Sequence, residues 1–261
     1  MRPNRTKQLL RDGKTAFGCF VRYPDSTLVE VMGHHGWDFF VFDGEHGTLE
    51  PHSCEDMVRA SELRDVTAIV RVPTNQPHVI LRFLDTGALG CQVPWVRTPE
   101  DAELAVQSVK YQPRGARGLA GVRAADYGER GVLGDYVRSA NEETLVVVQV
   151  ESASGVDNVD AIAAVDDVDV VFIGPTDLSN SLGLPGDLGH PTVVEHLERA
   201  AAGILAAGKV LGVTVADAET AKAWMQRGAR YVTTGVDPIL GAGSSRFLAH
   251  LRAERAQRAG R

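Results

Sequence analysis

The sequence predicts an α/β fold, a (β/α)8 or TIM barrel, formed by a single domain over residues 1–261. Eight short runs rich in β-branched and aromatic residues begin between positions 16 and 230, about 31 residues apart on average, which is the length of one βα unit. Most runs are apolar throughout, as parallel strands covered on both faces require. No Gly-x-Gly-x-x-Gly turn follows an early strand, which argues against an open doubly wound sheet.

Strands and helices are expected to alternate along the chain. The strands are expected in runs that start at Ala16 (AFGCFV), Trp37 (WDFFVFD), Thr67 (TAIVRV), Ala88 (ALGCQV), Thr144 (TLVVVQV), Asp169 (DVVFIG), Lys209 (KVLGVTV) and Arg230 (RYVTTG). Amphipathic patterns predict helices over residues 51–64, 99–110, 192–207 and 218–227. Gly228 follows the last of these and is suited to end it.

One interval between predicted strands is too long for a plain βα unit. It runs from Val93 to Thr144 and contains the segment YQPRGARGLAGVRAADYGERG at residues 111–131. Connections of this length inside a compact domain usually have a function. We therefore expect a glycine- and arginine-rich substrate loop here, on a βα connection.

The composition excludes several classes of protein. With 27 basic and 34 acidic residues the net charge is −7, and a nucleic-acid-binding surface would need the opposite balance. No apolar run approaches the roughly 18–20 residues of a membrane span, and the first residues lack the apolar core of a secretory signal. The 3 cysteines form no Cys-x-x-Cys pair, so neither a disulfide framework nor a zinc ribbon is indicated. We expect a cytoplasmic protein that binds small molecules.

In a TIM barrel the active site lies at the carboxyl ends of the strands. Polar residues stop the predicted strands at this end consistently: Asp43, Glu45 and His46 after the second, Arg71 in the third, Gln149 and Glu151 in and after the fifth, and Asp177 after the sixth.

Glu151 and Asp177 are the candidate metal ligands. They follow neighbouring strands, which lie about 4.8 Å apart in a sheet, so one oxygen-seeking cation could touch both carboxylates. Such a pair leaves positions for water and substrate, as at Mg²⁺ or Mn²⁺ sites. The alternative is that each carboxylate only stabilises the first turn of the helix that follows. Spacing alone leaves both interpretations open.

His46 and Arg71 are the candidates for proton transfer and anion binding. His46 lies in a glycine-flanked loop directly after a strand, where an imidazole is accessible for acid–base work, although a histidine held by backbone groups would look the same. Arg71 ends an apolar strand and would meet an anion or pair with Asp43 or Glu45. None of the 5 lysines is expected at the catalytic face, which disfavours Schiff-base chemistry and favours a metal by elimination.

Six motifs in series resemble the HpcH/HpaI family of metal-dependent class II pyruvate aldolases. They are FDGEHG (42–47), IVRVP (69–73), YxPxGxRG (111–118), QVES (149–152), FIGPTDLS (172–179) and GVDPIL (235–240). The resemblance implies a barrel that forms hexamers by exchanging C-terminal helices, with a dimer as the fallback. It also implies a Mg²⁺, Mn²⁺ or Co²⁺ ion, no organic cofactor, and reversible cleavage of 4-hydroxy-2-oxo acids into pyruvate and an aldehyde.

The resemblance also implies roles for individual residues. Glu151 and Asp177 would hold the metal, Arg71 would bind the enolate oxygen, and His46 would be the acid–base group, oriented by Asp85. Four residues would surround the pyruvate half: Gln149 and the backbone of Gly174, Pro175 and Thr176. Apart from the resemblance, we expect Asp43, Glu45, Trp95 and Arg123 to support the site from around it or from the substrate loop.

The chain departs from the family pattern at two places. Gly47 stands where these aldolases usually have alanine, and residues 119–131, with Arg123, do not match the usual loop. The departures concern which aldehyde is used. Two other functions remain open: a decarboxylase of oxaloacetate, or a lyase that traps the enolate with another electrophile, and an inactive barrel that binds a metal or a carboxylate. Four polar groups at one barrel mouth are costly for a merely structural protein, which argues against the last.

Overall fold

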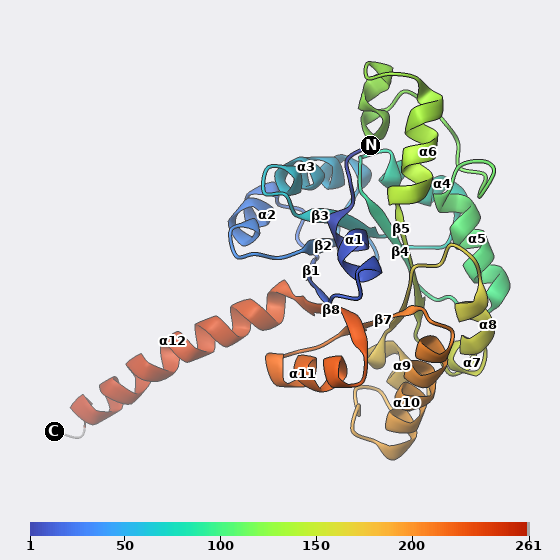
Figure 1. Cartoon of the computed structure of the whole chain (residues 1–261). Coiled ribbons are helices and arrows are strands. Elements are labelled where there is room, and N and C mark those ends of the chain that lie inside the picture. Colours follow the sequence, from blue (N-terminus) through green and yellow to red (C-terminus); the bar gives the residue numbers. More distant parts are fainter. Residues whose placement is uncertain (260–261) are drawn as a thin grey trace.

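The computed structural model describes residues 1–259, which fold into one closed barrel of eight parallel strands surrounded by helices (Figure 1). Each strand pairs with the next, and β8 pairs with β1. The strands are β1 (Ala16–Val21), β2 (Phe39–Asp43), β3 (Thr67–Arg71), β4 (Gly90–Val93), β5 (Leu145–Val150), β6 (Val170–Ile173), β7 (Val210–Thr214) and β8 (Ala229–Gly235). The predicted TIM barrel and all eight predicted strands are confirmed; residues 260 and 261 of the predicted domain lie outside the described part.

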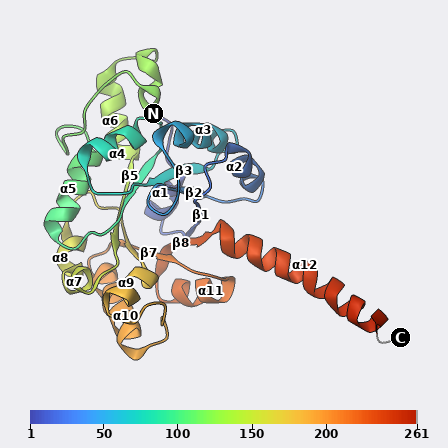
Figure 2. The same ribbon diagram turned by 180° about the vertical axis from the view of Figure 1, so that it is seen from behind.

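Helices surround the barrel, except for the last helix along the chain, which extends away from it (Figures 1 and 2). They are α1 (Arg5–Arg11), α2 (Ser26–Gly33), α3 (Pro51–Glu62), α4 (Pro77–Leu84), α5 (Pro99–Val109), α6 (Leu133–Glu143), α7 (Ala153–Asp157), α8 (Val159–Ala164), α9 (Pro175–Ser181), α10 (Pro191–Ala206), α11 (Ala218–Gln226) and α12 (Val236–Ala259), with a 3-10 helix η1 (Arg123–Gly128). Several begin at proline, whose fixed φ and missing N–H suit the first helical position. Gly228, at φ 99°, follows α11 as expected.

Alternate residues of each strand enter two separate apolar layers. Phe39 and Val41 point into the barrel, where the Phe39 ring stacks on Tyr231 with centroids 4.3 Å apart. Phe40 and Phe42 belong to the outer layer between strands and helices. Gly18 makes the inner packing feasible, because a Cβ there would lie 2.1 Å from the Phe39 ring. The filled interior leaves the carboxyl ends of the strands as the place for a site.

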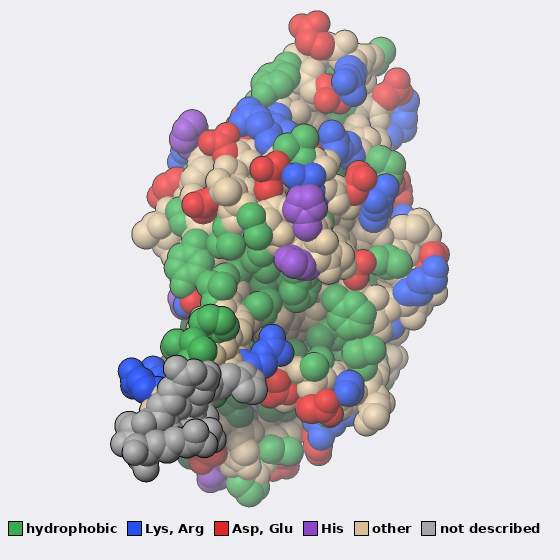
Figure 3. All heavy atoms as spheres, turned by 90° about the vertical axis from the view of Figure 1, so that its left-hand side faces the viewer, with side chains coloured by type: hydrophobic (Ala, Val, Ile, Leu, Met, Phe, Trp, Pro, Cys, Tyr) green, Lys and Arg blue, Asp and Glu red, His purple; other side chains and the backbone are tan. Residues whose placement is uncertain are grey.

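The long helix α12 leaves the barrel after β8 and extends away from it, as two opposite views show (Figures 1 and 2). Exposed apolar side chains lie along it at Ile239, Leu240, Phe247, Leu248 and Leu251. Hydrophobic side chains also gather beside the base of this helix, on the hollowed face from which it departs (Figure 3). No helix within residues 1–259 has both the length and the apolar character that crossing a membrane requires.

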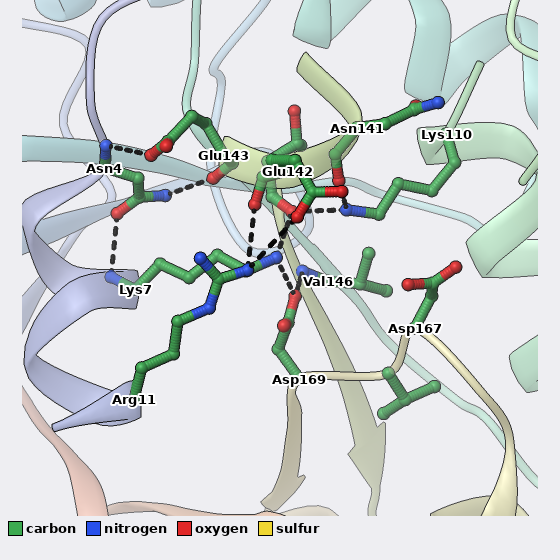
Figure 4. Close-up of polar contacts among 12 residues, drawn as sticks. Asn4, Lys7, Arg11, Lys110, Asn141, Glu142, Glu143, Val146, Asp167 and Asp169 are labelled. Carbon is green, nitrogen blue, oxygen red and sulfur yellow. Dashed lines mark hydrogen bonds and ion pairs between the residues drawn. The ribbon is translucent and has the colours of Figure 1, made fainter. Parts of the chain in front are cut away.

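Two buried lysines lie at the amino-terminal end of the barrel, opposite the carboxyl ends of the strands (Figure 4). The ammonium group of Lys7 donates to the Thr144 carbonyl at 3.0 Å and to Asp169 at 2.9 Å. Lys110 donates to the carbonyls of Asn141 and Thr144 at 2.7 and 2.8 Å. Both side chains therefore hold together the amino-terminal end of the barrel, which we call the barrel floor.

The segment over residues 111–131 lies at this amino-terminal end as well. It follows α5, which begins beside the carboxyl end of β4 and returns toward the floor, so the segment is part of an αβ connection. Our expectation of a βα connection is wrong, because the helix predicted over 99–110 precedes the insertion and has already reversed the chain direction. The segment does not cover the mouth of its own barrel.

Candidate active site

A cavity of about 420 Å³ opens at the carboxyl ends of the strands. Most of the predicted site residues line it together: Asp43, His46, Arg71, Gln149, Glu151, Gly174, Pro175, Thr176 and Asp177. They come from β2, β3 and β5, from the residues that follow β2, β5 and β6, and from the first turn of α9. The barrel topology thus brings together groups as far apart in sequence as His46 and Asp177.

Asp43 organises the part of the site that contains Arg71 and His46. Its carboxylate is 1% exposed and accepts hydrogen bonds from Nε and a terminal nitrogen of Arg71 at 2.9 and 2.7 Å. Its Oδ1 also accepts from the backbone N–H groups of Glu45 and His46, both at 3.1 Å. His46 itself is exposed and lines the cavity. Asp43 therefore holds the loop on which His46 is presented.

Trp95 connects two acidic residues of the site. Its indole N–H donates to Glu45 at 3.0 Å, and its backbone N–H donates to Oε1 of Glu151 at 2.8 Å. Its φ of 56° is unusual for a residue with a side chain and costs roughly 1–3 kcal/mol, a strain that local contacts must balance. Burial raises the pKa of Glu45, although Arg71, His46 and the indole oppose the shift.

A chain of buried amides, which the sequence analysis missed, leads from the barrel interior to Glu151. The Tyr231 hydroxyl donates to Gln92 at 3.1 Å, the Gln92 amide donates to Gln149, and the Gln149 amide donates to Oε2 of Glu151 at 2.7 Å. Glutamine within the otherwise apolar β4 was the available signal, since a buried amide needs partners. This chain fixes the orientation of the Glu151 carboxylate.

Glu151 and Asp177 fit a divalent cation. Glu151 is 2% exposed, and burial, together with the charges of Glu45 and Asp177, raises its pKa to about 7. Gly174 stands beside it, where a Cβ would lie 2.6 Å from Oε2 and crowd the carboxylate. Among the described side chains no three metal-binding residues converge, so the protein would supply two carboxylates and leave positions for water and substrate. Carboxylate oxygens suit Mg²⁺ and Mn²⁺.

The start of α9 offers backbone donors to an anion. Gly174 precedes the helix and has no side chain to cap it, and Pro175 occupies the first helical position. Of the backbone groups that we expected to hold a carboxylate, the Gly174 N–H already donates to the Val150 carbonyl at 3.3 Å and Pro175 has no N–H. Among the described residues, the N–H groups of Thr176 and Asp177 have no hydrogen-bond partner, because the first amides of a helix lack carbonyls within it. Such amides favour a carboxylate.

Asp85 and Arg123 are not at this mouth. Asp85 follows the last turn of α4, beside the barrel floor, and accepts from Arg117 at 2.9 Å. Arg123 donates to the Thr86 carbonyl at 2.7 Å and to Glu62 at 2.6 Å. Within the single chain, Asp85 therefore does not lie beside His46, because α4 has carried it to the opposite end of the barrel. The carboxylate that supports the His46 loop is Asp43.

A TIM barrel that presents an imidazole, a guanidinium and two carboxylates around one cavity at the carboxyl ends of its strands has the arrangement of a barrel enzyme. Residues 16–241 match the profile of the HpcH/HpaI aldolase/citrate lyase family, so the chain belongs to this family. It is an aldolase, a carbon–carbon lyase of the class II pyruvate aldolase type.

Relatives agree with this assignment. The chain is 37% identical over 236 residues to a hydroxypyruvate/pyruvate aldolase of Roseobacter denitrificans, which covers 90% of this chain and 91% of the relative. It is 37% identical over 235 residues to the 5-keto-4-deoxy-D-glucarate aldolase of Escherichia coli K12, with the same coverage. The crystal structure of an HpcH/HpaI aldolase/citrate lyase family protein from Burkholderia cenocepacia superposes with a TM-score of 0.90 at 36% identity, covering 95% of this chain and 99% of that one.

Proposed function

We propose that this protein reversibly cleaves 4-hydroxy-2-oxo acids into pyruvate, or a related 2-oxo acid, and an aldehyde, with a bound Mg²⁺, Mn²⁺ or Co²⁺ ion. The observation that carries the proposal is the convergence of His46, Arg71, Glu151 and Asp177 on one cavity. A cleavage of this kind needs a base at the C4 hydroxyl and positive charge near the developing enolate. His46 can supply the base. Arg71, together with a cation held by Glu151 and Asp177, can supply the positive charge.

The metal would be held by Glu151 and Asp177. When bound, it supplies electrophilic stabilisation of the negative charge that develops on the enolate oxygen. The buried amide of Gln149 holds Oε2 of Glu151, and the Trp95 N–H holds Oε1, so the carboxylate is oriented before any ligand arrives.

The pyruvate half of the substrate would lie between α9 and Arg71. The N–H groups of Thr176 and Asp177, which have no partner at the start of α9, would receive its carboxylate. Arg71, held rigidly by Asp43, would donate to the 2-oxo oxygen as it becomes an enolate oxygen. Orientation by fixed partners lowers the cost of reorganisation during the reaction.

His46 would act on the C4 hydroxyl. In the cleavage direction it accepts the hydroxyl proton, the C3–C4 bond breaks, the aldehyde leaves, and the bonding electrons remain on the pyruvate enolate, which then takes a proton at C3. In the synthetic direction the same imidazole returns its proton to the new alkoxide. Asp43 contributes by holding the His46 backbone N–H.

The test is metal removal combined with a search for a covalent adduct. EDTA should abolish pyruvate-dependent aldol activity, and Mg²⁺, Mn²⁺ or Co²⁺ should restore it. Borohydride added with pyruvate should trap no adduct, because none of the 5 lysines lines the cavity. Full activity of the EDTA-treated protein, or a lysine adduct found by mass spectrometry, would contradict the proposal. Glu151→Ala and Asp177→Ala should each lose metal binding, measured by calorimetry.

A further inference from the structure

A second arginine, Arg22, lines the same cavity as His46 and Arg71. It follows the last residue of β1, and its side chain is 51% exposed. Neither the metal, the pyruvate half nor the C4 hydroxyl requires it in the proposed reaction. A cation at this edge of the mouth would therefore contact another part of the substrate.

The two arginines differ in how much of each guanidinium is already engaged. Arg71 is bound through two hydrogen bonds to Asp43, lies 3.1 Å from Glu45, and is only 11% exposed. Arg22 approaches Asp237 through Nε at 3.1 Å. Among the side chains that the structure describes, its two terminal nitrogens have no hydrogen-bond partner. The guanidinium carries five N–H donors, so Arg22 keeps an edge for a further anion.

The backbone of Arg22 is held against the His46 loop by Gly47. A Cβ on Gly47 would lie 2.8 Å from the Arg22 carbonyl oxygen and 3.2 Å from that of Asp43, closer than such atoms pack. Only glycine therefore allows the end of β1 to approach this loop so closely. The absence of a side chain at Gly47 thus allows the Arg22 backbone to lie beside the loop that carries His46.

Asp237, in the first turn of α12, contacts the guanidinium at its Nε. The Tyr23 hydroxyl donates to one of its oxygens, and Arg22 approaches the other. A carboxylate on one edge orients an arginine and leaves the opposite edge for a ligand. Apolar groups of Leu188, Val215 and Pro238 line the cavity nearby and suit a carbon chain.

We propose that Arg22 is a specificity-determining residue that binds an acidic group, a carboxylate or a phosphate, at the far end of the aldehyde half. This inference rests on the proposed aldol reaction and narrows its substrates to 4-hydroxy-2-oxo acids with a second, distal anionic group. The pyruvate carboxylate has its own donors at α9, and a neutral aldehyde gives an arginine at this position nothing to bind.

The test compares aldehydes with and without an anionic group, using the metal-loaded enzyme and pyruvate. Glyoxylate and succinic semialdehyde are paired with acetaldehyde and butanal, and D-glyceraldehyde 3-phosphate is paired with D-glyceraldehyde. The parent should prefer the anionic member of at least one pair, and the pair identifies carboxylate or phosphate. Arg22→Gln should lower the ratio of kcat/KM for that pair by about 10- to 100-fold, the scale of a lost hydrogen bond to a charged group. Arg22→Lys should recover part of the preference.

Tyr23→Phe is the matched control, because it loosens the same Asp237 contact without removing the cation, and Tyr23 does not line the cavity. Its ratio should stay near that of the parent. Equal loss in Tyr23→Phe and Arg22→Gln would show that this cluster only fastens α12, and would overturn the inference. An aldol activity whose ratio is unchanged in Arg22→Gln would overturn the inference alone. No aldol product with any aldehyde would overturn the proposed function and this inference with it.

Discussion

Arg71 and Asp43 occupy paired positions on neighbouring strands and meet in two parallel hydrogen bonds of 2.9 and 2.7 Å. Burial alone would raise the pKa of Asp43, but hydrogen bonds from Arg71 and from the backbone of His46 and Glu45 outweigh burial and lower it. The pair therefore stays ionised inside the barrel mouth. It connects the anion-binding group to the loop that carries the acid–base group.

Replacing Asp43 by asparagine should destabilise the protein. The change leaves Arg71, which is 11% exposed, without its main counter-ion, and removing one partner of a buried pair costs about 3–5 kcal/mol. Glu45 remains as a second partner, so we expect the lower end of this range. Urea unfolding measures the loss. Glu219→Gln, which breaks the exposed pair with Lys222, should cost less than about 1 kcal/mol, and equal losses in both variants would contradict the interpretation.

Changes of His46 and Arg71 should separate two reactions. Aldol turnover requires a base at the C4 hydroxyl, whereas decarboxylation of oxaloacetate generates the enolate by loss of CO₂ and has no hydroxyl proton to remove. His46→Ala should lower aldol turnover by about 10²–10⁴ and retain much of the decarboxylation. Arg71→Ala should damage both. Steady-state assays of both reactions at saturating metal decide the matter, and equal losses in the His46 variant would assign it to substrate binding or to the enolate step.

Interrupting the buried amide chain should weaken metal binding from a distance. Gln92→Leu removes the group that orients Gln149, which in turn holds Glu151. Loss of such outer partners costs roughly 10- to 100-fold in metal affinity, and titration calorimetry with Mn²⁺ measures it. Tyr231→Phe removes only the last hydroxyl of the chain and should have a smaller effect. An unchanged affinity in Gln92→Leu would show that Trp95 alone positions Glu151.

Lys110 should make the stability depend on pH. Burial, followed by the charge of Lys7, lowers its pKa from 10.5 to about 7; Arg114 adds to the shift and Asp169 opposes it. Between these two values the unfolded chain binds a proton that the folded chain does not, so the free energy of unfolding rises as the pH rises from 7 toward 10.5. Below pH 7 the lysine is protonated in both states and contributes no slope.

Urea unfolding at pH 7, 8 and 9 measures this dependence. The parent should gain more stability over this range than Lys110→Met, in which the titrating group is absent and other groups contribute alike. Lys222→Met, at an exposed position, should follow the parent. Parallel curves for the parent and Lys110→Met would contradict the lowered pKa.

The apolar side chains of α12 should be buried in an assembly. Phe247 is 67% exposed and Leu251 50% exposed in the single chain, which is costly for a helix without a partner. We expect a hexamer, with a dimer as the fallback, and the double change of Phe247→Asp and Leu251→Asp should dissociate it. Arg246→Glu, on the same helix, is the control for added negative charge. Light scattering decides, and a monomeric parent at micromolar concentration would contradict the expectation.

The sequence by itself determined the barrel and most of its mouth. Runs such as TLVVVQV form strands because they are apolar on both faces, and their regular spacing closes one sheet with helices outside. Once the strands are parallel, the residues at their carboxyl ends must meet. For this reason His46, Arg71, Glu151 and Asp177 could be placed together from the sequence alone.

The tertiary structure alone decided which end of the barrel Asp85 and residues 111–131 occupy. A strand pattern does not show whether an insertion stands before or after the helix that reverses the chain, and here α4 and α5 carry these groups to the floor. Contacts across the barrel are equally hidden in the sequence. Gln92 meets Gln149 and Tyr231 because side chains of different strands converge in the closed interior, and Arg22 approaches the His46 loop because Gly47 leaves room for it.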